Sequence, residues 1–115
     1  MYFENYLEEH IKKFPEATAQ DQLWHLCEEL NEMEEAEEED FLKEWADALF
    51  VAISLQRFLH TQQLAEIMIN TLYFDYSMDT QKTIDEYLKK ALKKVKSRKY
   101  YFINGHYERE RNEKA

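Results

Sequence analysis

The chain has 115 residues, of which 44 % are hydrophobic and 34 % charged, and its formal net charge is −9. This length suits one domain with one core, residues 1–115, and the apolar content is too high for an intrinsically disordered chain. With one glycine and one proline, the chain lacks the tight turns of a β-sandwich or barrel and the glycine-rich loops that cradle phosphates. The negative charge disfavours a general nucleic-acid binder.

The first two predicted elements are helices with recognisable ends. Residues 5–14 read as a short helix, because Asn5 and Glu8 resemble a capping box and Pro15 stops the helix. Thr18 offers an N-cap for a second helix. The apolar positions of this second helix recur at helical spacing and are Leu23, Leu26, Cys27, Leu30 and Met33. Cys27 is therefore expected to be a small core residue.

Three more helices are expected, which makes the fold class all-α, a bundle of four to five helices. A third helix is predicted over residues 40–59 and a fourth over residues 61–76. The fifth begins near Asp79 or Thr83 and reaches about Arg98, since Thr83 and Glu86 again fit a capping box. From Ala46 onward the third helix is apolar nearly all round, which is typical of a central buried helix.

The C-terminal region has a different pattern. Asn104-Gly105 lies between two β-prone runs, which is the strongest short-range signal for a β-hairpin. We therefore expect a small C-terminal hairpin. The charged residues 108–115 are expected to fray.

The sequence shows no pattern of a targeting signal or a disulfide. Met1 is followed by acidic and aromatic residues rather than by a signal peptide. The longest apolar run, Ala48 to Leu55, is too short to span a bilayer, and the single cysteine has no internal disulfide partner. These features predict a cytoplasmic protein with no membrane partner.

Charge is distributed very unevenly along the chain. Nine acids occupy the 13 residues from Glu28 to Asp40, while ten of the 15 bases lie between Lys89 and Ala115. The simplest interpretation is two solvated faces that attract each other, with a basic helix C-terminus that complements the helix dipole.

Two acids of the third helix do not fit that interpretation. Glu44 and Asp47 are spaced i, i+3 and share one face, which continues as Val51, Ser54 and Leu55. These carboxylates therefore lie at the N-terminal end of a helix face that is otherwise expected to be buried. Two carboxylates about 4 Å apart repel by roughly 4 kcal/mol at an effective dielectric constant of about 20. Such a site must take up a proton, recruit Lys or Arg, or bind a cation.

The second helix can complete this site. The short connection between the two helices requires them to be antiparallel neighbours, so Glu29 and Glu32 would face Glu44 and Asp47. A cluster of four carboxylates suits the hard cations Mg²⁺, Mn²⁺ and Ca²⁺. A di-iron site would need Glu-x-x-His, and no histidine of this chain has a glutamate three residues before it.

The same residues resemble a known family. Glu28-Glu29-Leu30-Asn31-Glu32 followed by Glu44-Trp45-Ala46-Asp47 is similar to the EExxE…ExxD signature of the MazG-like all-α nucleoside triphosphate pyrophosphatases. The apolar continuation, residues 48–53, also resembles the family, and the similarity covers about residues 18–59. The basic stretch 96–99 resembles the family's phosphate-proximal segment more loosely, within a basic helix and hairpin over about residues 80–108.

The resemblance implies a Mg²⁺-dependent hydrolase, with Mn²⁺ as a substitute ion, that splits a (deoxy)nucleoside triphosphate into the monophosphate and pyrophosphate. It also implies a homodimer or homotetramer with sites near the subunit interface. The metal ligands would be Glu29, Glu32, Glu44 and Asp47. Glu28 would orient or deprotonate water, so that Glu28 and Glu29 form the catalytic pair. Residues 56–82 have no counterpart in this resemblance.

Further side chains are candidates for substrate contacts. Lys96, Arg98 and Lys99 would hold the pyrophosphate end, or else form a solvated helix end. Trp24 and Trp45 would stack on a base or pack in the core or an interface. His25 would touch the substrate or lie on the surface.

Two alternatives to the enzyme remain open. The acidic block also suits a non-catalytic helical module that binds a basic partner, and the carboxylates also suit a metal-binding bundle without hydrolysis. The sequence also indicates oligomerisation, because the C-terminal part of the chain has more aromatic residues than one small core can bury. These aromatic residues are Tyr73, Phe74, Tyr76, Tyr100 and Tyr101.

Overall fold

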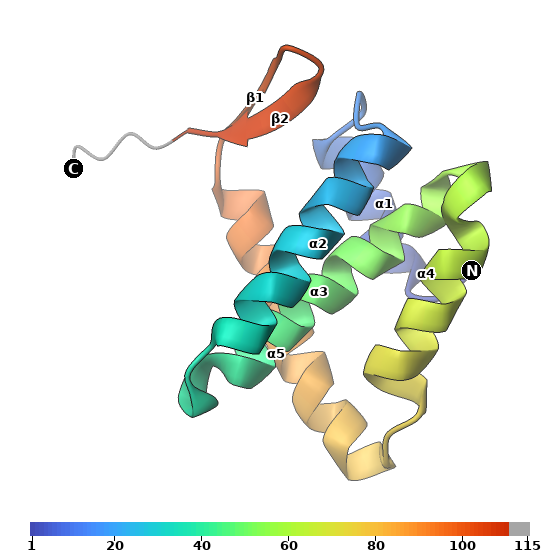
Figure 1. Cartoon of the computed structure of the whole chain (residues 1–115), viewed down its shortest axis with the longest axis vertical. Helices are drawn as coiled ribbons and strands as arrows, with labels where there is room; N and C mark the ends of the chain where they lie inside the picture. The colour runs from blue at the N-terminus through green and yellow to red at the C-terminus, as the bar shows by residue number, and fades with distance from the viewer. Residues whose placement is uncertain (111–115) are drawn as a thin grey trace.

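The computed structural model describes residues 1–110, and residues 111–115 lie outside the description. Of the described residues, 75 % are helical, and they form five α-helices and a small two-stranded antiparallel hairpin. The elements in chain order are α1 (Glu4–Lys13), α2 (Ala19–Glu35), α3 (Phe41–Ser54), α4 (Gln62–Ile69), α5 (Met78–Ser97), β1 (Tyr100–Ile103) and β2 (His106–Arg109) (Figure 1). The predicted helical bundle with a C-terminal hairpin is confirmed at this level.

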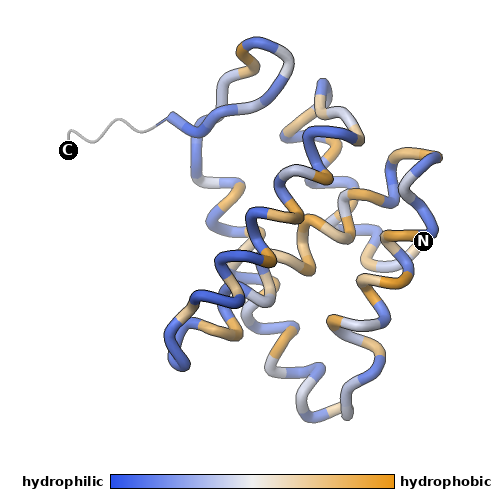
Figure 2. The backbone as a smooth tube through the Cα atoms, viewed as in Figure 1, coloured by the Kyte–Doolittle hydropathy of each residue, from blue (hydrophilic) through white to orange (hydrophobic). Residues whose placement is uncertain are grey.

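Helix α3 is the centre of the fold. It packs against α1, α2, α4 and α5, and Leu49 and Ile53 in its C-terminal half are at most 1 % exposed. Figure 2 shows the contrast between this apolar helix and the hydrophilic turn that leads into it. The apolar run predicted this burial, because a helix that is hydrophobic all round needs neighbours on every side.

Helices α2 and α3 are antiparallel neighbours, as their short connection predicted (Figure 1). The connection includes a 3-10 turn, Glu38–Asp40. The N-terminal half of α3 therefore lies beside the C-terminal half of α2. This pairing brings the two acidic motifs to the same end of the bundle.

Several helix ends differ from the predictions. The Thr18 N-cap is confirmed, since its hydroxyl accepts from the backbone N–H of Asp21. Helix α1 begins after Phe3 without a side-chain cap, and α5 is capped by Ser77 rather than by Thr83. Ser77 occupies the extended backbone conformation that an N-cap requires, whereas Thr83 lies inside the helix.

The third and fourth helices are also shorter than predicted. After α3, the chain forms 3-10 turns at Leu55–Arg57 and Leu59–Thr61. The Thr61 hydroxyl donates to the carbonyl oxygen of Leu55 at 2.6 Å, which satisfies one of the acceptors that the end of α3 exposes. Helix α4 passes into a π-helical turn, Asn70–Phe74.

The hairpin has the predicted turn. Asn104 and Gly105 have φ angles of 55° and 83°, which matches a two-residue turn that needs positive φ at both positions. Phe14 contacts Tyr100 and Tyr107 edge to face, at centroid distances of 4.7 and 5.1 Å. Residues 108–109, expected to fray, belong to β2, while residues 111–115 of the predicted tail lie outside the described residues.

Two further predictions concern burial and the membrane. Cys27 is exposed, so its assignment to the core was wrong. The apolar stripe of α2 turns toward α3 through Leu26, and Cys27 lies one residue beyond it. Within residues 1–110, no helix is long and apolar enough to cross a membrane.

Candidate functional site

A cleft of about 1100 Å³ lies between α2, α3, α5 and the hairpin. It is lined by acidic, basic and aromatic side chains from all four elements. Within it, α3 contributes residues from Lys43 to Val51, which span about 12 Å along the helix at a rise of about 1.5 Å per residue.

Three carboxylates converge at the acidic end of the cleft. Glu29 of α2 and Glu44 and Asp47 of α3 each place one oxygen within 4.8 Å of the others. All three side chains are half-buried. We call Glu29, Glu44 and Asp47 the acid triad. It follows from the i, i+3 spacing on α3 and from the antiparallel pairing with α2.

Burial and crowding change the acidity of the acid triad. Desolvation and the charges of Asp47, Glu32 and Glu44 raise the pKa of Glu29 to about 8. Desolvation and the charges of Asp47 and Glu32 also raise the pKa of Glu44. Glu29 therefore carries a proton at neutral pH in the metal-free protein.

Lys94 supplies the nearest positive charge. Its Nζ lies 3.2 Å and 3.1 Å from Oδ1 and Oδ2 of Asp47, and the two side chains are largely buried, with exposures of 33 % and 14 %. Sequence reasoning missed Lys94. Its position three residues after the inward-facing Ala91 was the available signal, because i and i+3 share a helix face.

The remaining glutamates of the first motif lie at the rim. Glu32 lines the cleft and is exposed, but it is not one of the three converging carboxylates. Glu28 is also exposed, and its Oε1 lies 3.4 Å from Nδ1 of His25. The predicted cluster of four is therefore a triad with Glu32 beside it.

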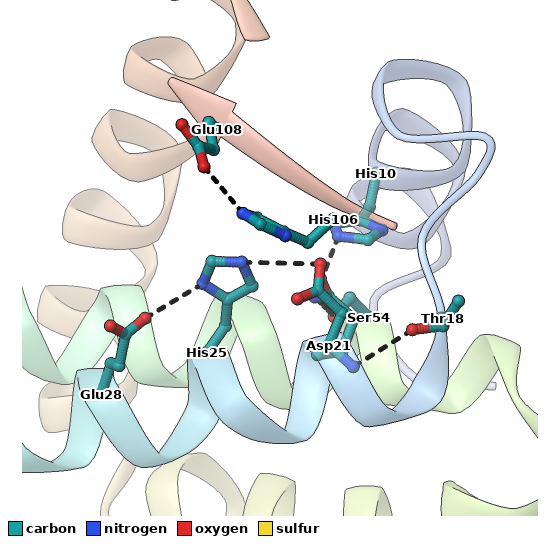
Figure 3. A network of polar contacts seen from close by, with 9 residues as sticks. His10, Thr18, Asp21, His25, Glu28, Ser54, His106 and Glu108 are labelled. Atoms are coloured by element: carbon teal, nitrogen blue, oxygen red, sulfur yellow. Dashed lines mark hydrogen bonds and ion pairs between the residues drawn. The ribbon is translucent and has the colours of Figure 1, made fainter. Parts of the chain in front are cut away.

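Two histidines, His25 and His106, line the cleft, and Figure 3 shows their polar contacts. His25 lies between Glu28 and Asp21, with its Nε2 at 3.9 Å from Oδ2 of Asp21. His106 of β2 contacts Glu108 at 2.8 Å, and this hydrogen bond raises the pKa of His106. Each imidazole is thus paired with a carboxylate.

The predicted phosphate-binding bases have different surroundings. Arg98 lines the cleft, whereas Lys96 and Lys99 do not. The Lys96 Nζ lies 3.8 Å from Oε1 of Glu9 on α1, so this lysine points away from the acid triad. Lys96 is two residues after Lys94 and so lies on a different face of α5, whereas Arg98 follows the end of the helix.

The two tryptophans also differ. Trp45 donates from Nε1 to the carbonyl oxygen of Leu72 at 2.8 Å and packs against Phe41 and Tyr76, which fits the packing interpretation. Trp24 lines the cleft and is 65 % exposed. It is therefore accessible to a ligand.

The hairpin contributes a wall that sequence reasoning did not include. The whole of β2, residues 106–109, lines the cleft, together with Tyr100 of β1. Only the close approach of the hairpin to Phe14 and α2 creates this wall. No local pattern in the sequence encodes that approach.

A buried histidine lies at the base of the cleft. His10 is 4 % exposed, and burial together with the charge of Arg57 lowers its pKa to about 3. Its ring nitrogens lie 3.1 Å from Gln22 Nε2 and 3.1 Å from Arg57 Nη1. His10 is therefore neutral and joins α1, α2 and the 3-10 turn that follows α3.

The donor set of the acid triad fits a hard divalent cation. Carboxylate oxygens from two helices are the ligands that Mg²⁺ and Mn²⁺ prefer. A cation there would offset the repulsion that raises the pKa of Glu29 and Glu44. Glu29, Glu44 and Asp47 are the residues that would hold it.

Known proteins give no independent assignment for this cleft. Comparisons of the chain with protein-family models, curated proteins and solved structures found no match. A function for the cleft therefore has to be inferred from its own donor atoms, their distances and their charges.

Proposed function

We propose that the cleft hydrolyses (deoxy)nucleoside triphosphates to the monophosphate and pyrophosphate with the help of Mg²⁺. The observation that carries this proposal is the acid triad, in which three carboxylate oxygens lie within 4.8 Å of one another. The resemblance of the two acidic motifs to those of the MazG-like pyrophosphatases supports the same chemistry.

The electrostatics of the cleft support a polyanionic substrate only when a cation is present. The acid triad by itself repels phosphate groups. A divalent ion held by Glu29, Glu44 and Asp47 would supply positive charge to neutralise phosphate oxygens. Lys94, in contact with Asp47, adds a positive charge from α5.

Glu28 is the candidate general base. Its carboxylate lies at the edge of the cleft and contacts His25, which orients it. In the proposed reaction a water oxygen bonds to the α phosphorus, and the bond between the α phosphorus and the bridging oxygen breaks. The water proton passes to Glu28, and pyrophosphate leaves.

A product assay tests this proposal. The chain is incubated with a panel of NTPs and dNTPs and Mg²⁺, and the monophosphate and pyrophosphate are quantified. We expect pyrophosphate from at least one nucleotide and a loss of at least about 100-fold in Glu44→Gln. Glu38→Gln, in the exposed turn before α3, is the control and should retain activity.

Two results would contradict the proposal. One is the absence of pyrophosphate from every nucleotide while an unrelated pyrophosphatase is active in the same buffer. The other is release of inorganic phosphate with a nucleoside diphosphate, because that product pair means cleavage at a different bond.

A second candidate function rests on a separate observation. Six acids before α3 are exposed and lie outside the cleft, namely Glu34, Glu35, Glu37, Glu38, Glu39 and Asp40. They favour a non-catalytic module that binds a basic partner. That function predicts no thermal stabilisation by Mg²⁺ with nucleotide.

The proposed enzyme is a homodimer or homotetramer, as the resemblance implies. Exposed apolar side chains support association, because large apolar patches are unusual on a monomer. Ile67 of α4 is 60 % exposed and Met78 of α5 is 73 % exposed. Light scattering of the purified chain measures the mass, and a monomeric mass would overturn this part of the proposal.

A further inference from the structure

Two arginines line the cleft without a counter-ion among residues 1–110. The guanidinium groups of Arg98 and Arg109 make no ion pair within 4.0 Å, and no side-chain hydrogen bond, to another residue in the range 1–110. Both side chains line the cleft and are only partly exposed. An unpaired guanidinium in a cleft is a ready site for an anion.

The backbone brings these two arginines together. Arg98 follows α5 directly, and Tyr100 two residues later pairs with Arg109 across the hairpin. Two residues of chain span at most about 7 Å, and paired residues lie about 5 Å apart. The two Cα atoms are therefore within about 12 Å, a gap that two long side chains can close.

Arg98 also lies near the acid triad, and Arg109 lines the same cleft. Arg98 is four residues beyond Lys94, directly after the last residue of α5, and Lys94 contacts Asp47 at 3.1 Å. The cleft is therefore lined by three carboxylates, by Lys94 and by the two arginines. The imidazoles of His25 and His106 are already paired with carboxylates.

We propose that Arg98 and Arg109 bind the phosphates that leave as pyrophosphate, so that the hairpin is part of the substrate site. This inference rests on the proposed function, and it names the residues that contact the leaving group. A guanidinium donates two parallel hydrogen bonds to phosphate oxygens, which a lysine cannot do with the same geometry.

The packing of the hairpin holds Arg109 in place. Tyr107, two residues earlier on the same face of β2, contacts Phe14, and its hydroxyl accepts from the backbone N–H of Glu16 at 3.0 Å. These contacts anchor β2 on the segment between α1 and α2. Arg109 therefore lines the cleft from an anchored strand.

Calorimetric binding of inorganic pyrophosphate in the presence of Mg²⁺ tests the inference without turnover. We expect Arg98→Gln and Arg109→Gln each to weaken binding by about tenfold to 100-fold, since each removes charged hydrogen bonds. Lys93→Gln is the matched control, because it removes one positive charge from the exposed side of α5 outside the cleft. It should bind within about twofold of the unsubstituted chain.

Separate controls test whether each variant folds and whether the geometry of the guanidinium group matters. Circular dichroism and thermal unfolding show whether each variant retains the fold. Arg109→Lys keeps the charge but loses the bidentate geometry, so it should restore only part of the affinity. Pyrophosphate binding that weakens by about tenfold to 100-fold in Arg109→Gln and recovers in part in Arg109→Lys supports a direct phosphate contact.

The outcomes separate this inference from the proposed function. If the chain binds pyrophosphate through both arginines but hydrolyses no nucleotide, the proposed function fails and the anion site stands. If it hydrolyses nucleotides while Arg109→Gln binds pyrophosphate normally, the hairpin contact is overturned. If the chain neither binds pyrophosphate nor hydrolyses nucleotides, both are overturned.

Discussion

The carboxyl of Glu29 illustrates how the metal-free protein tolerates three crowded acids. One solution is protonation of a carboxyl group, since the pKa of Glu29 is raised to about 8. The other solution is an ion pair with an ammonium group, since Lys94 contacts both carboxylate oxygens of Asp47. Both solutions are expected when carboxylates are crowded and half-buried, and a divalent cation would replace both.

Protonation of Glu29 predicts a pH-dependent stability. The folded pKa of about 8 lies above the ordinary value of 4.5, so the contribution to stability is full below about pH 4.5 and is lost as the pH rises to about 8. We expect the melting temperature of the metal-free chain to fall across this window. Glu29→Gln should flatten the fall, as measured by thermal unfolding in chelator.

The control for this measurement is an exposed glutamate. Glu38→Gln removes a carboxyl from the turn before α3 and should leave the slope unchanged. An equal slope in Glu29→Gln and in the unsubstituted chain would mean that Glu29 is not the titrating group.

Lys94 predicts a competition between its ammonium and a divalent ion. Because Lys94 contacts Asp47, Lys94→Met should tighten Mg²⁺ binding above pH 8, where Glu29 is ionised. The expected change is on the order of tenfold, measured by calorimetry without nucleotide. Lys93→Met is the exposed control on the same helix. Weaker Mg²⁺ binding in Lys94→Met would show that the lysine assists the ion.

Among the elements, the helix ends and the hairpin turn were unequally predictable. Asn104-Gly105 predicted its turn because positive φ at both positions leaves few alternatives. The start of α5 was harder, because Ser77 and Thr83 both carry hydroxyls that can cap a helix. In the structure the Ser77 hydroxyl accepts from the backbone N–H of Thr80, and the helix begins at Met78.

The N-cap of α5 gives a prediction about this element. The Ser77 hydroxyl accepts from the backbone N–H of Thr80 at 3.3 Å, so Ser77→Ala should lower the free energy of unfolding by about 1 kcal/mol. Thr83→Ala, inside the helix, should be neutral or slightly stabilising because alanine has the higher helix propensity. Urea unfolding of both variants measures the difference, and a larger loss in Thr83→Ala would count against the Ser77 cap.

In the molecule as a whole, α3 joins the core to the site. Its C-terminal half carries the buried Leu49 and Ile53, and its N-terminal half carries Glu44 and Asp47. The packing of α3 against four helices fixes the direction of both carboxylates. Binding at the acid triad is therefore linked to the stability of the entire bundle.

Mg²⁺ should accordingly stabilise the folded chain. At 100 times the dissociation constant, the expected gain is about 2.7 kcal/mol, which raises Tm by roughly 10 °C. NaCl at equal ionic strength controls for screening of the net charge of −9. Equal shifts with both salts, or the same Mg²⁺ shift in Glu44→Gln, would argue against a specific site.

Local patterns in the chain were enough to predict the helical class, the central position of α3 and the approach of Glu29 to Glu44 and Asp47. These features follow from helical periodicity, one short connection and the scarcity of turn residues. The pairing of Lys94 with Asp47 and the position of β2 along the cleft came to light only in the folded molecule. Such contacts join residues far apart in the chain, and they depend on how α5 and the hairpin pack, which no local spacing encodes.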